Sequence, residues 1–511
     1  MSVVRTTLVL ILSAVTVGTA GAQDEPGYPI RDFLGLTAFT ELAVSPNGHH
    51  VAFVTLADDF ERNRPEMAIW RIDLDSRGRK ISAVRLTATP GACSGIRWSP
   101  EGRYLAFLST RAPATTQQLL VLDMRGGEPV VLTDPDTYSE GISAYDWLPD
   151  GSGILFAALD PPSDEEREEA KAVYGDVIRI AEEMPSTSFW HIAASEFNRP
   201  SAKRIATVAT HVIEVHISPD GRQVAYLSGP PTKPEVFTKS FSQTEVFLLP
   251  ADGGAAPRQL THNYIAEQGL QWTRDGGGLY TSGNGDPGAE RTQWTQGRLF
   301  HIDPQNGQAE IIVPGFPGEL NAPFGSSSYV QLPDGSLLSG ANVSTRTNIY
   351  AVDPAAGRAR QLTDFRGAAT SPSASRDGRL IAFILATAES FPELYVARGA
   401  SNLADARPVS DFNARLGAMP MPETQTIRWP NGEGDEVEGV LYWPPGRRAE
   451  ANLPLIVDIH GGPWWAKTED ITFNAPFVFA YYPALLASRG YLVLEPNYRG
   501  GTGRGDAFLH A

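Results

Sequence analysis

Two adjacent glycines in the last tenth of the sequence could do chemistry through their backbone. The segment His460-Gly461-Gly462-Pro463 ends an apolar run that begins at Leu455. Because glycine has no Cβ, its N–H group can come close to a bound atom. Two such groups at the end of a buried strand can form an oxyanion hole, which stabilises the negative oxygen formed when a carbonyl is attacked. Gly461 and Gly462 are our candidate oxyanion-hole donors, and an ordinary strand-to-helix loop is the alternative.

A strand–helix–strand unit must position these glycines. Leu455 to His460 is short, apolar and rich in β-branched residues, which predicts a strand buried on both faces. Ala475 to Arg489 predicts an amphipathic helix, with Gly490 at the position where helices often end on glycine. Tyr491 to Pro496 predicts the next strand. This order predicts a right-handed βαβ unit in a mostly parallel sheet.

A second glycine-rich motif, NYRGGTGRG, follows the second strand. HGGP and this motif together resemble the start of the α/β-hydrolase domain of the prolyl oligopeptidase family of serine peptidases. The acylaminoacyl-peptidase-like branch is the most similar, and the dipeptidyl-peptidase-like branch is related. Gly501 stands where serine is common in that branch, and Arg504 stands where tyrosine is common.

The resemblance implies a catalytic Ser in a G-x-S-x-G turn, followed by Asp and His. No G-x-S-x-G occurs in these 511 residues. We therefore expect a hydrolase segment truncated before the catalytic serine, with no member of the triad and no hydrolytic activity of its own. In the family a later histidine is the base, so His460 is expected to orient the loop.

The resemblance also suggests substrate-binding residues. In the dipeptidyl-peptidase branch a double glutamate binds the substrate amino terminus, which makes Glu182 and Glu183 candidates. Their surroundings, IRIAEEMPST, match that motif poorly, and a solvated pair is the alternative. Trp464 would line a pocket wall or pack against one, whereas Tyr498 and Arg499 would hold the second loop or contact substrate.

The long middle of the chain contains a repeated hairpin pattern. Strand, P-D-G-like turn and second strand recur seven times, beginning at Ala43, Arg97, Asp146, His216, Gln271, Val330 and Ser373. Proline presets φ, Asp or Asn bonds to its own backbone, and glycine takes a positive φ, so each turn is tight. Alternating apolar residues after the turn, such as Val51 and Phe53, predict a half-buried strand.

A second pair of strands separates these hairpins. One carries a short W/Y/F-x-x-D pattern, as in Ile69 to Asp73, and the other ends in Leu-Thr, as at Leu86-Thr87. Four strands in each of seven repeats predict an all-β seven-bladed β-propeller, followed by the N-terminal part of an α/β-hydrolase domain with an incomplete parallel sheet. The family resemblance implies the same propeller, placed so that it restricts access to the active site.

The ends of these regions can be estimated from composition. Residues 1–22 read as a signal peptide cleaved after Ala22, which predicts a secreted or periplasmic protein. Residues 23–420 form the propeller with its lead-in, and residues 421–511 form the partial hydrolase domain, with a Pro-rich boundary at MPMPE. The charged stretch from Asp164 to Ala172 predicts an exposed helix inserted in the propeller.

Composition excludes several classes of partner. The net charge of −17 argues against nucleic acid and, once the signal is removed, against an anionic membrane. Cys93 is the single cysteine, which excludes an intramolecular disulfide and a cysteine-based metal site. No metal-ligand motif or nucleotide-binding loop is present, so neither a metal nor a cofactor is expected.

These observations predict an exported serine-type peptidase that hydrolyses short peptides, with the propeller gating access. One alternative is a non-catalytic propeller that binds a partner and carries a relic of a hydrolase. Another is a different α/β-hydrolase activity, such as an esterase, for which the long propeller is atypical. The expected partner is a peptide substrate, and a homo-oligomer is left open.

Overall fold

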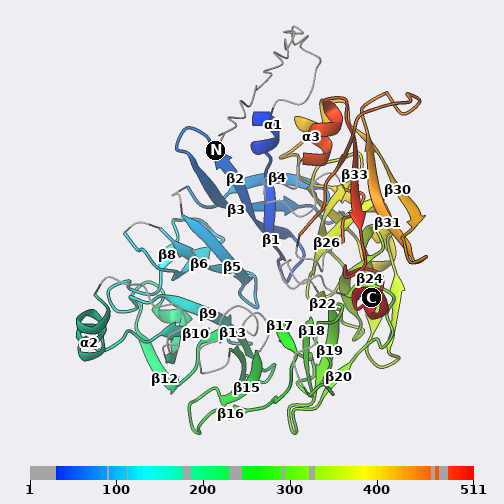
Figure 1. The fold of residues 1–511 in the computed structure, drawn as a ribbon. Coiled ribbons are helices and arrows are strands. Elements are labelled where there is room, and N and C mark those ends of the chain that lie inside the picture. The colour runs from blue at the N-terminus through cyan, green and yellow to red at the C-terminus, as the bar shows by residue number, and fades with distance from the viewer. Residues whose placement is uncertain are drawn as a thin grey trace, which may run out of the picture.

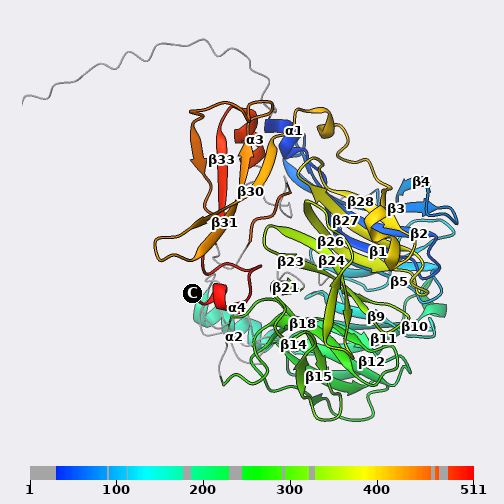
Figure 2. The same cartoon turned by 90° about the vertical axis from the view of Figure 1, so that its right-hand side faces the viewer.

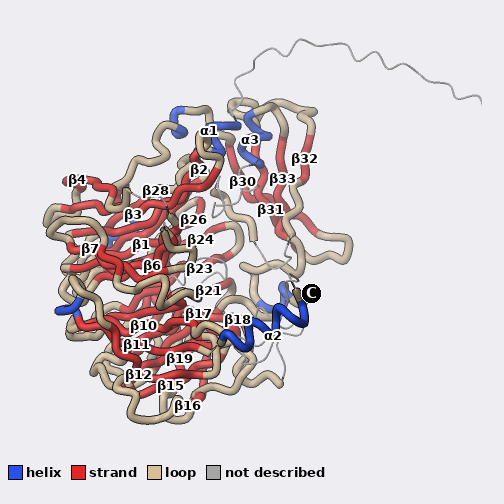
Figure 3. The backbone as a smooth tube through the Cα atoms, turned by 90° about the vertical axis from the view of Figure 1, so that its left-hand side faces the viewer, coloured by secondary structure: helices blue, strands red, loops and turns tan. Residues whose placement is uncertain are grey.

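The computed structural model describes residues 30–88, 91–111, 113–175, 186–229, 244–290, 294–320, 329–461, 466–470 and 482–511. The predicted signal peptide therefore lies outside the described residues, as do Glu182, Glu183, Gly462 and Trp464. Strands dominate this part of the chain (Figure 3). The α-helices are α1 (Ile30–Leu34), α2 (Asp164–Tyr174), α3 (Tyr482–Ser488) and α4 (Asp506–Leu509). None of these described helices has the length and apolarity needed to span a membrane.

Most strands belong to seven consecutive units, which we number 1 to 7. Units 1 and 2 contain β1 (Ala38–Val44), β2 (His50–Asp59), β3 (Arg64–Leu74), β4 (Lys80–Arg85), β5 (Ala92–Trp98), β6 (Tyr104–Thr110), β7 (Gln118–Asp123) and β8 (Val130–Val131). Units 3 and 4 contain β9 (Ile142–Trp147), β10 (Gly153–Leu159), β11 (Thr187–Ala193), β12 (Ala202–Val208), β13 (Val212–Ile217), β14 (Gln223–Ser228), β15 (Glu245–Pro250) and β16 (Arg258–Gln259).

The later units follow the same antiparallel order. Unit 5 contains β17 (Ala266–Trp272), β18 (Leu279–Asn284), β19 (Arg298–Ile302) and β20 (Ala309–Ile311). Unit 6 contains β22 (Tyr329–Gln331), β23 (Leu337–Val343), β24 (Arg346–Asp353) and β25 (Arg358–Gln361), with β21 (Glu319–Leu320) added beside β23. Unit 7 contains β26 (Gly367–Ala374), β27 (Ile381–Thr387), β28 (Glu393–Ala397) and β29 (Arg407–Pro408). One parallel pair, Thr347 with Ala368, links units 6 and 7 into a nine-stranded sheet.

The seven predicted hairpins are confirmed as the first two strands of the seven units. The turn of unit 4 illustrates the chemistry, because the Asp220 carboxylate accepts from the backbone N–H of Arg222 at 3.0 Å and Gly221 has a φ of +73°. The predicted Leu-Thr pattern also has a local role. The Thr87 hydroxyl accepts from the N–H of Ile69 at 3.0 Å, and the threonines at the same position in units 2, 4 and 6 accept equivalent bonds.

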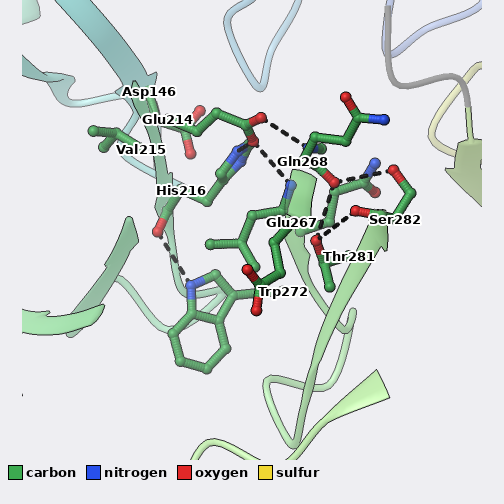
Figure 4. Close-up of polar contacts among 12 residues, drawn as sticks. Asp146, Glu214, Val215, His216, Glu267, Gln268, Trp272, Thr281 and Ser282 are labelled. Carbon is green, nitrogen blue, oxygen red and sulfur yellow. Dashed lines mark hydrogen bonds and ion pairs between the residues drawn. The ribbon is translucent and has the colours of Figure 1, made fainter. Parts of the chain in front are cut away.

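Consecutive units pack face to face around a ring (Figure 1). The series continues from unit 5 to units 6 and 7, and a cluster containing Val51, Phe53, Leu380 and Leu394 packs unit 7 against unit 1. Trp272 of unit 5 donates its indole N–H to the carbonyl of His216 in unit 4 at 3.1 Å (Figure 4). We refer to units 1 to 7 as the ring.

This packing corrects the prediction of half-buried second strands. In β2 the residues from Val51 to Thr55 are all buried, so both faces of the strand lie in the core. The reason is that each unit packs between two neighbours, which covers both of its faces. The predicted surface helix is confirmed as α2, whose first turn is capped by Ser163 and Glu166.

A separate sheet follows the ring, in the order β30 (Glu423–Pro430), β31 (Glu436–Trp443), β33 (Leu492–Asn497) and β32 (Leu455–Val457). Figure 2 shows this C-terminal sheet beside the ring, with α1 and α3 near one end. Its core contains Val440, Tyr442 and Val493 packed against Ala484 of α3 and Leu36 beside α1. The predicted second strand of the βαβ unit, Tyr491 to Pro496, is confirmed as β33, which runs parallel to β32.

The prediction of a strand buried on both faces from Leu455 to His460 is wrong. The strand β32 ends at Val457 and has only β33 as its described partner. Leu455, Val457 and Ile459 are 54%, 47% and 68% exposed. Apolar composition indicated a strand, but its place at the edge of the sheet depends on the order in which strands assemble.

Candidate functional site

Two loops begin at the same end of the C-terminal sheet, where the parallel strands β32 and β33 finish. β32 and β33 are parallel, with Leu455 opposite Leu492 and Val457 opposite Leu494. The helix α3 precedes β33, and Gly490 after it has a φ of +92°, as predicted for a helix-ending glycine. We name the described residues 458–461 and 466–470 the first glycine loop, and residues 498–505 the second glycine loop. The carboxyl ends of parallel strands place both loops together, which is where ligands bind in such sheets.

Gly461 lies in the first glycine loop with open space around it. It is exposed, and a Cβ built on it would meet no atom of the described residues within 4 Å. A bound group could therefore approach its backbone closely. Gly462, the other predicted donor, and Trp464 lie outside the described residues.

His460 and Tyr498 hold the start of this loop. Their rings stack with centroids 4.7 Å apart and an angle of 17° between planes, and the Tyr498 hydroxyl donates to the carbonyl of His460. His460 is 8% exposed, and its Nδ1 lies 3.2 Å from the carbonyl oxygen of Gly461. Burial lowers the pKa of His460, so the imidazole is neutral at neutral pH. Tyr498 thus links the second glycine loop to the first, and a loop-orienting role for His460 stays a prediction.

Arg499 points to a different part of the sheet. Its guanidinium pairs with Asp435 at 3.0 Å and with Glu433, both in the turn between β30 and β31. A pocket of about 420 Å³ opens beside Arg499 and Tyr498, with Trp429 also in its lining. The arginine thus fixes the second glycine loop to the hairpin. Contact of either side chain with substrate stays a prediction.

A buried polar network connects the first glycine loop with β33, the strand that leads into the second. Lys467 and Glu495, 4% and 3% exposed, form an ion pair of 2.6 Å, and the Tyr442 hydroxyl donates to Glu495 at 2.9 Å. Burial raises the pKa of Glu495 above its ordinary value, although the charge of Lys467 opposes this. The Asn497 side chain accepts from the Lys467 N–H at 2.7 Å and donates to its carbonyl at 3.0 Å. The network joins the end of the first loop to β33.

The sequence prediction missed this network, although a signal was present. In β33 the buried face carries Val493, Glu495 and Asn497, so two polar side chains share a face with a core residue. Polar groups at buried positions need partners, which points to a structured site nearby. Lys467, the partner, lies too far away in the sequence to be assigned by pattern.

The second glycine loop rests on the ring. Gly503 donates its N–H to the side chain of Gln296 at 2.8 Å, and Gln296 in turn donates its own N–H to Asp506 at 2.8 Å. Arg298 pairs with the same Asp506. Among the residues with described positions, no cluster of three or more His, Cys, Asp or Glu side chains could hold a metal.

Several known peptidases are similar to this chain in sequence. No family model matches the chain. An uncharacterized peptidase, YuxL of Bacillus subtilis, is 32% identical over 124 residues, which are 24% of this chain and 18% of that protein. Dipeptidyl-peptidase 5 of Porphyromonas gingivalis is 21% identical over 538 aligned residues, covering 97% of this chain and 71% of that protein.

The solved structures include a similar fold. The acylaminoacyl peptidase of Pyrococcus horikoshii aligns with a TM-score of 0.67 and 18% identity, covering 94% of this chain and 68% of that one. At this identity the likeness concerns the fold. The chain thus spans less than a fifth of the first of these relatives and about two thirds of the others.

Proposed function

Because the chain belongs to the prolyl oligopeptidase family of serine peptidases, we propose that it is part of a peptidase that hydrolyses short peptides. In this proposal the backbone N–H groups of Gly461 and Gly462 hold the carbonyl oxygen of the scissile bond as it becomes negative. The observation that carries the proposal is that Gly461 is exposed and lies four residues after Val457, where β32, the parallel partner of β33, ends.

The other site residues would position this glycine. The Tyr498 hydroxyl donates to the His460 carbonyl, and the two rings stack. The His460 carbonyl and the Gly461 N–H belong to one peptide unit, so these contacts also fix the orientation of that N–H. A neutral, buried imidazole that bonds to its neighbour's carbonyl is suited to this role. Arg499 and Tyr498, beside their pocket, remain candidate substrate contacts, as do Trp464, Glu182 and Glu183 in the sequence.

We also propose that the ring is a seven-bladed β-propeller that restricts access to the site. The packing of unit 7 on unit 1 and the contacts of the ring with the second glycine loop support this proposal. The nucleophile must come from outside these residues, since they contain no G-x-S-x-G. Export after cleavage behind Ala22 is part of the same proposal, and N-terminal sequencing of secreted protein tests it, because retention of Met1 would contradict cleavage.

A fluorophosphonate probe tests whether hydrolysis belongs to the whole protein. The 511-residue polypeptide should show no stoichiometric serine adduct, whereas the complete translation product that contains it should be labelled and should cleave fluorogenic short peptides. A labelled serine within the 511 residues would overturn the assignment of the nucleophile. An unlabelled and inactive complete product would favour a propeller that binds a partner.

Two substitutions at one position test the oxyanion role. In the complete product, Gly461→Pro removes the N–H donor and should lower kcat about 10²-fold to 10³-fold. Gly461→Ala keeps the donor, and its methyl group would meet no described atom within 4 Å, so it is the matched control and should retain most activity. Equal activity of the two variants would show that this N–H does not stabilise the transition state.

A further inference from the structure

The end of the first glycine loop carries a carboxylate that the catalytic proposal does not use. Glu469 is 3% exposed, yet it lies at the contact between the C-terminal sheet and the ring. Arg346, the first residue of β24, places its Nε 3.1 Å from the carboxylate. Arg366, directly before β26, places its Nε 3.2 Å from the same oxygen. Two arginines of the ring therefore converge on one side chain of the loop.

The C-terminal sheet holds the other oxygen of this carboxylate. Thr426 of β30 donates its backbone N–H at 3.1 Å and its hydroxyl at 2.7 Å. Glu469 also donates its own N–H to the carbonyl of Thr345 at 2.8 Å, in the turn between β23 and β24. Glu469 is thus bonded through side chain and backbone to both halves of the molecule.

The same turn reaches the second glycine loop. Ser344 donates its N–H to the carbonyl of Gly503 at 2.8 Å and its hydroxyl to buried Glu438 of β31 at 2.8 Å. Its φ of +60° is uncommon for a residue with a Cβ, and such a conformation persists where surrounding contacts hold it. A two-residue turn of unit 6 therefore contacts both loops at the edge of the C-terminal sheet.

The groups around Glu469 favour its ionised form. Burial raises the pKa of Glu469, but the hydrogen bond from Thr426 and the charges of Arg346 and Arg366 outweigh burial and hold it below its ordinary value. A buried carboxylate with fewer partners would be costly, so the arginines and the loop depend on one another. Each arginine has one further contact besides Glu469. Arg346 lies 3.4 Å from Asp364, and Arg366 donates to the carbonyl of Thr424 in β30 at 2.7 Å.

We propose that Glu469 is a positioning residue through which units 6 and 7 of the ring set the conformation of the loop that carries Gly461. The inference rests on the function proposed above for that glycine. It makes the ring a structural component of the site as well as a barrier around it. A bond that merely adds stability would have no particular effect on the loop.

Hydrogen–deuterium exchange of the 511-residue chain tests the coupling without requiring activity. Glu469→Gln weakens both arginine contacts, and Arg366→Gln removes one of them while leaving Arg346 and Thr426 in place as a milder change. Exchange in residues 459–470 should become about tenfold faster in Glu469→Gln, and residues 142–159 of unit 3 should be unchanged. Arg379→Gln, which alters an exposed ring arginine that pairs with Asp377, is the matched control and should leave the loop unaffected.

Activity of the complete translation product is the second measurement. Loosening of the loop should lower kcat with little change in KM, and Arg366→Lys, which keeps the charge, should retain more kcat than Arg366→Gln. If exchange of residues 459–470 does not respond to Glu469→Gln or Arg366→Gln, the coupling is refuted even where peptidase activity is present. If exchange responds but the unmutated product hydrolyses no peptide, the coupling stands and the proposed function fails.

Discussion

Glu267 allows the effect of pH on stability to be worked out from a single buried carboxyl. It lies on β17, where units 4 and 5 meet, and is 3% exposed (Figure 4). The Asn263 side chain donates to one of its oxygens at 2.9 Å, and the Thr244 hydroxyl lies 3.0 Å from the other. Burial raises the pKa of Glu267, and the nearby charge of Glu245 raises it further, to about 8.

The surrounding hydrogen bonds are compatible with a protonated carboxyl. The Thr244 hydroxyl donates to the main-chain carbonyl of Glu267 at 2.8 Å, so its oxygen can accept the proton of the carboxyl. A glutamine amide at this position could donate in the same way and would still accept from Asn263. Glu267→Gln should therefore preserve the packing and remove only the ability to ionise.

The sign and size of the effect follow from linkage. The pKa of Glu267 is about 8 in the folded protein, against an ordinary value of 4.5. Between these values the folded state binds the extra proton, so the free energy of unfolding falls as pH rises. For these two pKa values the loss between pH 5 and pH 8 is about 3 kcal/mol. Glu245 and Glu319, whose pKa values burial raises to about 7, act in the same direction.

Urea denaturation at several pH values between 5 and 8 measures this contribution. The unmutated protein should lose stability across the range, and Glu267→Gln should lose about 3 kcal/mol less. Glu310→Gln, at an exposed position on β20 of unit 5, is the control and should behave like the unmutated protein. An unchanged pH dependence in Glu267→Gln would refute the reasoning, because Glu267 would then ionise as freely in the folded state as in the unfolded one.

Three further predictions concern the C-terminal sheet. Gly503→Ala should lower the free energy of unfolding by at least about 1 kcal/mol more than Gly500→Ala. Both glycines have a positive φ, but of the two only a Cβ at position 503 would meet a described atom, the Asn342 Oδ1 at 2.2 Å. Equal losses in urea denaturation would contradict this. Tyr498→Phe removes the bond to the His460 carbonyl and should lower stability by about 1 kcal/mol, and an unchanged denaturation midpoint would count against that bond. In limited proteolysis, residues 423–511 should be cleaved earlier in time than the ring, because β32 exposes apolar residues at an open edge. Earlier cleavage of the ring would contradict this prediction.

The repeated hairpins were predictable because their chemistry is local. In unit 4, Ser218 accepts from the N–H of Gln223 at 2.9 Å and its hydroxyl donates to Asp220 at 2.6 Å. All partners of this turn lie within five residues, so the sequence pattern contains the whole interaction. Gly490 was predictable for the same reason, since its φ of +92° directly after α3 is a backbone conformation that glycine adopts without strain.

The place of each strand within its sheet was not local. The apolar run that predicted a strand from Leu455 to His460 gave no sign that Leu455 and Val457 would lie at an exposed edge. In unit 1, alternation suggested one buried face for β2, yet packing by two neighbouring units buried both. Hydropathy indicates that a residue can be buried, whereas the number of neighbouring layers decides whether it is.

By itself the amino-acid sequence determined the turns, the sevenfold repeat and the glycines of the two loops, because backbone conformation depends on neighbouring residues. Only the tertiary structure decided which charges meet. Glu469 lies 123 positions from Arg346 and 103 from Arg366, and Lys467 of the first glycine loop is paired with Glu495 of β33. Buried charges require partners, but a sequence contains many candidates, and folding alone selects those that arrive within hydrogen-bonding distance.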